Sequence, residues 1–232
     1  MHVTALIAAG GSGRRLGASV AKQLLDVGGR TLLERSIDAF RSHPAVDEVI
    51  VAVPADMLVA PPSCLAWLDG ARDVRLVAGG ERRQDSVANA FAAVSETVDI
   101  VLVHDAARPF VTSDVISRAI EGAVAHGAAI AALPVSDTVK RVVIDEVRTG
   151  GSVIVETLPR EEIFLAQTPQ AFRREVLQSA IAAGRSPEAT DEAMLAERAG
   201  YRVHVVIGDP RNSKVTTAAD LAGARARVEP AG

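Results

Sequence analysis

Short apolar runs recur along the chain, and stretches with helical periodicity separate them. Several runs are apolar at consecutive positions, which is typical of parallel strands that are covered on both faces. We predict strands over Val3–Ala9, Glu48–Val53, Val74–Val77, Ile100–His104, Ala128–Leu133 and Val203–Ile207. We predict helices over Thr31–Ser42, Gln84–Ser95, Ser113–His126, Arg174–Ala183, Asp191–Ala199 and Thr217–Val228. This alternation predicts the α/β class, with a single doubly wound, mostly parallel sheet. Such sheets bind ligands at the carboxyl ends of their strands.

Residues 136–164 interrupt this alternation, because they follow a predicted strand without forming an amphipathic helix. Two segments with partly alternating polarity, 138–143 and 152–157, flank acidic and glycine residues that signal a turn. This pattern predicts a protruding β-hairpin arm. An ordinary surface hairpin and an arm that packs on a second copy of the chain fit the pattern equally well.

The composition is that of a globular protein. Hydrophobic residues make up 48% and charged residues 23% of the 232 positions, which excludes a disordered chain and allows one good core. We expect one domain over residues 1–232. The formal net charge of −4 and the 3% aromatic content argue against nucleic acid as a partner, but they leave room for a local basic pocket.

The chain has one cysteine, Cys64, which excludes an internal disulfide framework and a cysteine-based metal site. A reducing compartment fits this usage. No apolar run reaches the length of a membrane span, and the first residues lack the basic start of a signal peptide. We therefore expect a cytoplasmic protein that has no membrane contact.

A glycine-rich stretch, AAGGSGRRLG at residues 8–17, directly follows the first predicted strand. Glycines let backbone N–H groups approach a phosphate closely. The stretch lacks the Gly-Lys-Ser/Thr of a P-loop, and Leu16 stands where a dinucleotide-binding loop needs Gly or Ala. A glycine loop alone is equally typical of a tight turn. Because Arg14, Arg15 and then Lys22 accompany these glycines, we favour a triphosphate as the ligand.

A second turn with glycines and arginines, residues 79–87, lies between another predicted strand and helix. Its backbone groups and Ser86 are suited to contacting the edge of a base, although capping of the helix is the simpler role for Ser86. Because both turns follow strands of the same sheet, we expect them to face each other.

A carboxylate, Asp105, ends the most apolar predicted strand. Mg²⁺ usually takes one or two carboxylates together with substrate phosphates and water, so this position suits a magnesium ion. An ion pair with Arg108 explains Asp105 equally well in isolation. We expect the preceding His104 to be packed or hydrogen-bonded rather than to act as a base. Lys214, after the last predicted strand, brings another cation to a strand end.

Several segments, taken in order, resemble the 2-C-methyl-D-erythritol 4-phosphate cytidylyltransferase family of the non-mevalonate isoprenoid pathway. They are Ala8-Ala9-Gly10 with Arg15 and Lys22-Gln23, Gly79-Gly80 with Arg83 and Ser86-Val87, Asp105-Ala106-Ala107-Arg108-Pro109, Asp137-Thr138, Thr168-Pro169-Gln170, Thr190-Asp191-Glu192 and Asn212-x-Lys214-Val215-Thr216. Each segment is a weak signal alone, and their common order over nearly the whole chain is a strong one. Two positions depart from the family: Ala21 replaces a common proline, and Arg82 replaces a frequent acidic residue.

The resemblance implies a Rossmann-like nucleotidyltransferase that transfers CMP from CTP to methylerythritol phosphate and releases pyrophosphate. It implies that Arg15, Lys22 and Lys214 are the catalytic cations around the α-phosphate. Asp105 would help to hold Mg²⁺ or another divalent cation. The nucleotide-binding residues would be Ala8, Ala9, Gly10, Gly11, Gly13, Gly80, Arg83 and Ser86. The acceptor-binding residues would be Asp105, Arg108, Thr138, Arg160, Thr168 and Thr190.

The family exchanges its hairpin arm between two subunits. The resemblance therefore implies a homodimer in which Thr138 and Arg160 serve the site of the partner subunit.

Three alternatives stay open at this point. A sister cytidylyltransferase acting on another polyol phosphate, such as ribitol 5-phosphate, would share the nucleotide half of the site. A non-catalytic nucleotide-binding protein would share the fold. A nicotinamide-linked dehydrogenase is disfavoured by Leu16.

Overall fold

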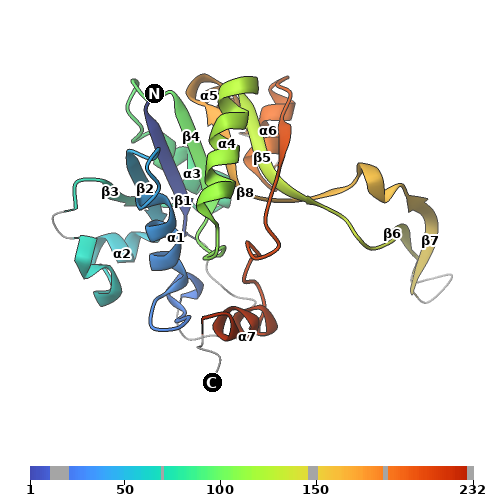
Figure 1. Cartoon of the computed structure of the whole chain (residues 1–232), viewed down its shortest axis with the longest axis horizontal. Helices are drawn as coiled ribbons and strands as arrows, with labels where there is room; N and C mark the ends of the chain where they lie inside the picture. Colours follow the sequence, from blue (N-terminus) through green and yellow to red (C-terminus); the bar gives the residue numbers. More distant parts are fainter. Residues whose placement is uncertain (11–20, 69–70, 146–150, 185–187, 229–232) are drawn as a thin grey trace.

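A seven-stranded sheet forms the centre of the molecule (Figure 1). The computed structural model describes residues 1–10, 21–68, 71–145, 151–184 and 188–228. The strand order is β3-β2-β1-β4-β8-β5-β9, and every pairing is parallel except those of β8. The strands are β1 (Val3–Ala8), β2 (Glu48–Val53), β3 (Val74–Ala78), β4 (Ile100–Asp105), β5 (Ala128–Pro134), β8 (Phe164–Arg173) and β9 (His204–Ile207). The doubly wound, mostly parallel sheet is thus confirmed.

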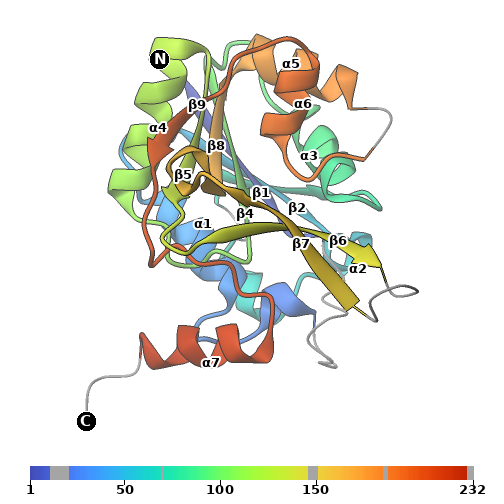
Figure 2. The same ribbon diagram turned by 90° about the vertical axis from the view of Figure 1, so that its right-hand side faces the viewer.

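Helices cover both faces of this sheet (Figure 2). One face carries α1 (Leu32–Arg41) and α4 (Ser113–His126), and the other carries α3 (Arg83–Phe91), α5 (Arg174–Ala183) and α6 (Glu192–Arg198). The remaining helical elements are η2 (Lys22–Leu24), α2 (Ala55–Val59), η3 (Ser63–Leu68), η4 (Arg160–Glu162) and α7 (Ala218–Ala226). Among the described helices, none has both the length and the apolar character needed to cross a membrane.

The apolar runs of the strands explain these two layers. Side chains alternate between the faces of a strand, so Val101 and Val103 of β4 pack with α3, α5 and α6, whereas Leu102 joins the opposite cluster with α1 and α4. A strand that must fill both layers is apolar at consecutive positions. α1 begins where the sequence places a capping box: the Thr31 hydroxyl accepts from the Glu34 N–H, and the Glu34 carboxylate accepts from the Thr31 N–H.

The strand β8 is the element that the sequence pattern missed. Three polar residues, Gln167, Thr168 and Gln170, and a proline between them hide the strand pattern, so the sequence predicts no strand here. It instead pairs antiparallel with β4 and β5, and these three polar side chains are at most 5% exposed. Pro169 lies where the pairing with β5 shifts register, so its missing N–H falls at an irregular part of the ladder.

The predicted hairpin arm is confirmed as β6 (Val139–Asp145) and β7 (Gly151–Leu158), which form a separate antiparallel pair. The pair projects away from the central sheet, to the right in Figure 1. Six of its apolar side chains, Val142, Val143, Ile144, Val153, Ile154 and Val155, are between 43% and 72% exposed. Apolar side chains are thus exposed on a two-stranded ribbon, a structure that is marginally stable in water when isolated.

Candidate active site

The candidate site lies at the carboxyl ends of β1 and β4. The chain passes from β1 outward to β2 and β3, and then returns to place β4 on the other side of β1. The winding direction therefore reverses between β1 and β4, where Ala8 pairs with Asp105. Such a reversal point is where doubly wound sheets bind their ligands, because the following loops diverge to opposite faces.

The second glycine turn lies against Gly10, the last described residue of the first glycine stretch, beside this point. The N–H of Gly80 donates to the Ser86 hydroxyl at 3.0 Å, and the hydroxyl lies 3.2 Å from the Arg82 carbonyl. A Cβ on Gly10 would lie 2.9 Å from the same hydroxyl oxygen, and one on Gly79 would lie 3.6 Å from the Gly10 Cα. Ser86 is not the cap of α3, which begins after Arg82. Its hydroxyl instead binds the second turn, and Gly10 approaches that hydroxyl too closely for a Cβ to fit without a shift.

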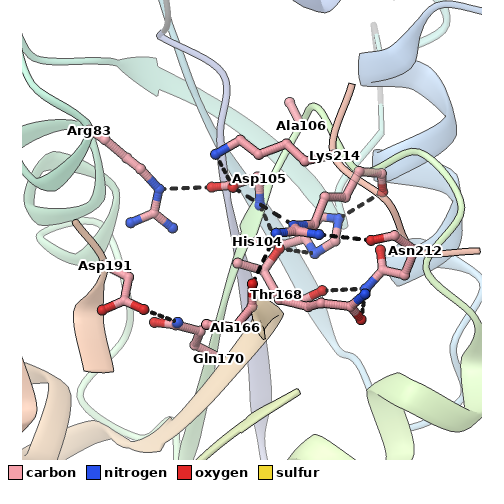
Figure 3. A network of polar contacts seen from close by, with 12 residues as sticks. Arg83, His104, Asp105, Ala106, Ala166, Thr168, Gln170, Asp191, Asn212 and Lys214 are labelled. Atoms are coloured by element: carbon pink, nitrogen blue, oxygen red, sulfur yellow. Dashed lines mark hydrogen bonds and ion pairs between the residues drawn. The ribbon is translucent and has the colours of Figure 1, made fainter. Parts of the chain in front are cut away.

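Asp105 is the centre of a charge cluster (Figure 3). Its Oδ1 accepts a hydrogen bond from Arg83 Nε at 2.7 Å, and its Oδ2 lies 2.7 Å from Lys214 Nζ. Arg108, the partner that the sequence suggested, is farther away, with 4.0 Å between its Nε and Oδ2. The structure thus brings together cations from α3, from the loop after β4 and from the segment that precedes α7.

This cluster keeps Asp105 ionised. Burial of the side chain favours the neutral acid, but the positive charges of Arg83 and Lys214 outweigh burial and hold the pKa of Asp105 well below its usual range. The Asp105 side chain is only 10% exposed. Asp105 therefore holds the two cations next to each other and takes no part in proton transfer near neutral pH.

His104 is packed and hydrogen-bonded, as predicted. Its Nε2 lies 3.1 Å from the Arg108 carbonyl, which only accepts, so Nε2 carries the proton. Its Nδ1 then accepts from the Thr168 hydroxyl at 2.9 Å, and that oxygen accepts from the Asp105 N–H at 3.1 Å. Burial lowers the pKa of His104 to about 4. His104 is therefore neutral and fully buried, and its hydrogen bond to Thr168 links β4 to β8.

Arg108 and Asn212 connect the site to the segment that carries Lys214. Arg108 donates to the Asn212 carbonyl at 2.8 Å and to the Ala166 carbonyl at 3.2 Å. The buried Asn212 amide donates to the Thr168 carbonyl at 2.7 Å. Sequence reasoning named Asn212 as part of a motif without giving it a role. The contacts show that it anchors the Lys214 segment to β8.

The segment with Lys22 is also held from the carboxyl-terminal side. Lys22 begins η2, and a small apolar cluster downstream joins Val27 and Leu32 to Val215 and Ala224 of the α7 region. The Arg225 side chain adds a hydrogen bond to the Asp26 carbonyl at 3.0 Å. The two lysines predicted as catalytic, Lys22 and Lys214, therefore lie on segments that pack against the same helix, at the bottom of Figure 1.

Arg83 has a second partner that sequence reasoning missed. Its Nη1 donates to both carboxylate oxygens of Glu192, at 2.8 and 2.6 Å. The two carboxylates raise the pKa of Arg83 although burial opposes them. Burial raises the pKa of Glu192, and Arg83 counters this effect. The only sequence signal for Glu192 was its place in the motif with Thr190 and Asp191.

Some predicted site residues lie apart from Asp105. Thr138 immediately precedes β6 and is exposed, and Arg160 lies in η4, where it donates to the Ser136 carbonyl at 3.0 Å. Both belong to the arm. Thr190 is exposed just before the N-cap residue of α6. Gly11, Gly13 and Arg15 lie outside the described residues.

The chain is similar to known proteins over nearly its whole length. The model of the IspD family, 2-C-methyl-D-erythritol 4-phosphate cytidylyltransferase, matches residues 3–230. This chain belongs to that family. A cytidylyltransferase of this name from Geobacter metallireducens is 42% identical over 235 residues, which cover 99% of this chain and 98% of the relative. The crystal structure of the enzyme of this name from Thermus thermophilus has a TM-score of 0.79 and 37% identity, covering 98% of this chain and 99% of the other.

The family also occurs as one half of longer proteins. A bifunctional IspD/IspF enzyme from Anaeromyxobacter sp. is 47% identical over 231 residues, which cover 98% of this chain and 58% of that enzyme. The IspD family membership removes the nicotinamide-linked dehydrogenase from the alternatives, and it makes the chain a nucleotidyltransferase by family.

Proposed function

We propose that this chain transfers the cytidylyl group of CTP to 2-C-methyl-D-erythritol 4-phosphate, giving 4-diphosphocytidyl-2-C-methyl-D-erythritol and pyrophosphate. The observation that carries the proposal is the ionised Asp105 with Arg83 and Lys214 bound to it at the reversal point of a family-matched chain. An oxygen of the acceptor phosphate attacks the α-phosphorus and forms the new P–O bond. The bond from that phosphorus to the bridging oxygen breaks, and pyrophosphate leaves with its electron pair.

This reaction requires positioning and charge neutralisation more than proton transfer. The attacking phosphate monoester has a second pKa of about 6, so it is largely ionised near neutral pH and needs no general base. The difficulty is that one anion must approach another. Fixed cations reduce that repulsion, and they do so best when a buried carboxylate orients them before the substrate arrives. Lys214, Lys22 and Arg15 are the cations that we assign to this task.

We assign the nucleotide to the two glycine turns. The residues assigned from the first stretch are Ala8, Ala9, Gly10, Gly11 and Gly13, and those from the second turn are Gly80, Arg83 and Ser86. The support is the close approach of Gly10 and Gly79, where an added Cβ on Gly79 would lie 3.6 Å from the Gly10 Cα. We assign the acceptor to Asp105, Arg108, Thr168 and Thr190, together with the arm residues Thr138 and Arg160.

The donor set around Asp105 fits a magnesium ion that arrives with the nucleotide. The described residues contain no group of three or more His, Cys, Asp or Glu side chains that could hold a metal alone. Mg²⁺ instead binds through one or two carboxylates, substrate phosphates and water, and Asp105 offers one ionised carboxylate. When bound, Mg²⁺ or another divalent cation would neutralise triphosphate charge. Lys214 and Arg83 keep the carboxylate oriented for it.

We further propose a cytoplasmic homodimer in which the arms are exchanged. The exposed apolar side chains of β6 and β7 support this proposal, because a large exposed apolar patch usually marks an interface. In the dimer, the partner subunit would cover these side chains. The location of Thr138 and Arg160 on the same arm supports their use in the partner subunit's site. The single cysteine supports a reducing compartment.

An isotope experiment tests the proposed reaction. The acceptor phosphate is labelled with ¹⁸O in its non-bridging oxygens and incubated with the chain, CTP and Mg²⁺. Direct attack on the α-phosphorus places all of the label in the cytidine diphosphate ester and none in pyrophosphate. Label in pyrophosphate, or release of labelled inorganic phosphate, would contradict the proposed bond formation.

Replacing Gly80 with Ala is expected to weaken CTP binding about tenfold or more. A Cβ at this position would lie 2.4 Å from the Asp85 Cβ and 3.0 Å from the Asp85 carbonyl carbon, so the second turn must shift away from Ser86. Titration calorimetry with CTP measures the effect. Gly223→Ala is the matched control, because its Cβ meets nothing within 4 Å and it lies inside α7. Unchanged CTP affinity in Gly80→Ala would contradict the assigned role of this turn.

A further inference from the structure

Glu192 is a buried carboxylate that the reaction chemistry does not use directly. It is the first residue of α6, and its side chain is 1% exposed. Burying a carboxylate is costly unless a cation and hydrogen bonds compensate it. Here the compensation comes from one group, the Arg83 guanidinium, whose Nη1 contacts both carboxylate oxygens. Glu192 and Arg83 are therefore matched partners, and neither is expected to tolerate loss of the other.

A second edge of the same guanidinium contacts Asp105. Arg83 Nε donates to Asp105 Oδ1 at 2.7 Å, so one planar group bridges a carboxylate on α6 and a carboxylate at the end of β4. A guanidinium is rigid, and fixing one nitrogen sets the direction of the others. Figure 3 shows Arg83 reaching Asp105 from the side opposite Thr168 and Asn212. The orientation of Asp105 toward Lys214 thus depends on where Glu192 holds Arg83.

The third nitrogen of the guanidinium adds an independent observation. Arg83 Nη2 is buried and has no hydrogen-bond partner in the part of the chain that the structure describes. A buried donor without a partner is costly, so native proteins rarely keep one without a reason. The two carboxylates are therefore the groups that fix the guanidinium among the described residues, and the third nitrogen adds no further anchor.

We propose that Glu192 is a positioning residue for the transfer reaction, which acts through the Arg83 guanidinium to hold Asp105 in the arrangement that the substrates require. This inference rests on the proposed function, so cytidylyl transfer by the unmodified chain is measured first. Absence of that activity would contradict the proposed function. If the unmodified chain is active and Glu192 substitutions leave kcat unchanged, only the role of Glu192 is contradicted.

The primary variant is Glu192→Gln, which keeps the shape and removes the charge. We expect kcat to fall about 10- to 100-fold, the range for residues that orient a functional group. Gln84→Leu is the matched control. Gln84 is also buried on α3 and binds the Gly184 carbonyl at 2.6 Å and the Ala189 N–H at 2.9 Å. This control is expected to lower the melting temperature while kcat stays within about twofold of wild type.

A double-mutant cycle separates positioning from stability. In an Arg83→Leu background, Glu192→Gln should change kcat by less than about twofold and raise the melting temperature, because it removes a buried charge that has lost its partner. Equal factors of lost kcat in both backgrounds would overturn the inference. A wild-type kcat in Glu192→Gln with only a lower melting temperature would also overturn it.

A second single variant keeps the test decisive if the double variant does not fold. Glu192→Asp retains the charge and withdraws it by one methylene. We expect it to lose less kcat than Glu192→Gln, since charge is what orients Arg83. A greater loss in Glu192→Asp than in Glu192→Gln would show that side-chain shape matters rather than charge, and it would overturn the inference.

Discussion

Replacing Lys214 with Met is expected to lower kcat about 100- to 1000-fold, the usual cost of removing one fixed group that stabilises transition-state charge. Lys214 Nζ lies 2.7 Å from Asp105 Oδ2, so the carboxylate holds the ammonium in place before substrate binds. Negative charge is redistributed toward the leaving pyrophosphate as the reaction proceeds. A preoriented cation therefore acts more strongly on the transition state than on bound CTP.

Steady-state kinetics at varied CTP concentration separates the effect of Lys214 on the transition state from its effect on CTP binding. The KM for CTP is expected to rise less than about tenfold in Lys214→Met, so that most of the loss appears in kcat. Arg118→Met is the control, because Arg118 lies on α4, donates to the Ile207 carbonyl at 2.9 Å just upstream of the same segment, and has no assigned role in the site. A Lys214→Met enzyme with wild-type kcat and a raised KM would limit Lys214 to ground-state binding.

Mixed dimers of two inactive variants are expected to recover activity. We call the part of each subunit outside the hairpin arm its body. Lys214→Met inactivates the site in the body of its own subunit, whereas Arg160→Ala removes an arm residue that we assign to the partner's site. A heterodimer of the two variants then contains one intact site, formed by the Lys214 body and the Arg160 arm. Random mixing of subunits makes about half of the dimers heterodimers, so activity should return to about 25% of wild type.

The control for this experiment is a mixture of Lys214→Met with Lys22→Ala subunits. We assign both residues to the body of one subunit, so neither variant can repair the site of the other. No recovery is expected. If the Lys214→Met and Arg160→Ala mixture also recovers nothing, although the subunits exchange, Arg160 does not serve the partner's site.

The sequence was sufficient to predict the strands whose side chains are apolar on both faces. β1, β2 and β4 are apolar at consecutive positions because each fills both layers of the core, and that pattern is visible without a structure. Asp105 could be predicted as a site residue because a carboxylate directly after such a strand must lie at the sheet's carboxyl edge. The arm could be predicted because it lacks helical periodicity where a covering helix would stand.

The missed features depend on contacts between distant segments. β8 is polar at Gln167, Thr168 and Gln170 because its side chains bind partners on other elements, such as Asp191 at 2.8 Å from Gln170. Local patterns therefore predict no strand there. The partners of Asp105 could not be predicted from local sequence either. Arg83 is 22 positions away, and only the fold places its guanidinium closer to the Asp105 carboxylate than that of Arg108.

Pyrophosphate release should be measured from CTP and Mg²⁺ with either 2-C-methyl-D-erythritol 4-phosphate or ribitol 5-phosphate as acceptor. We expect release with the first acceptor and only background release with the second. Release with ribitol 5-phosphate alone would preserve the fold and the nucleotide turns but contradict the acceptor assignment. Binding of CTP without pyrophosphate release from either acceptor would contradict the proposed catalytic role of the Asp105 cluster.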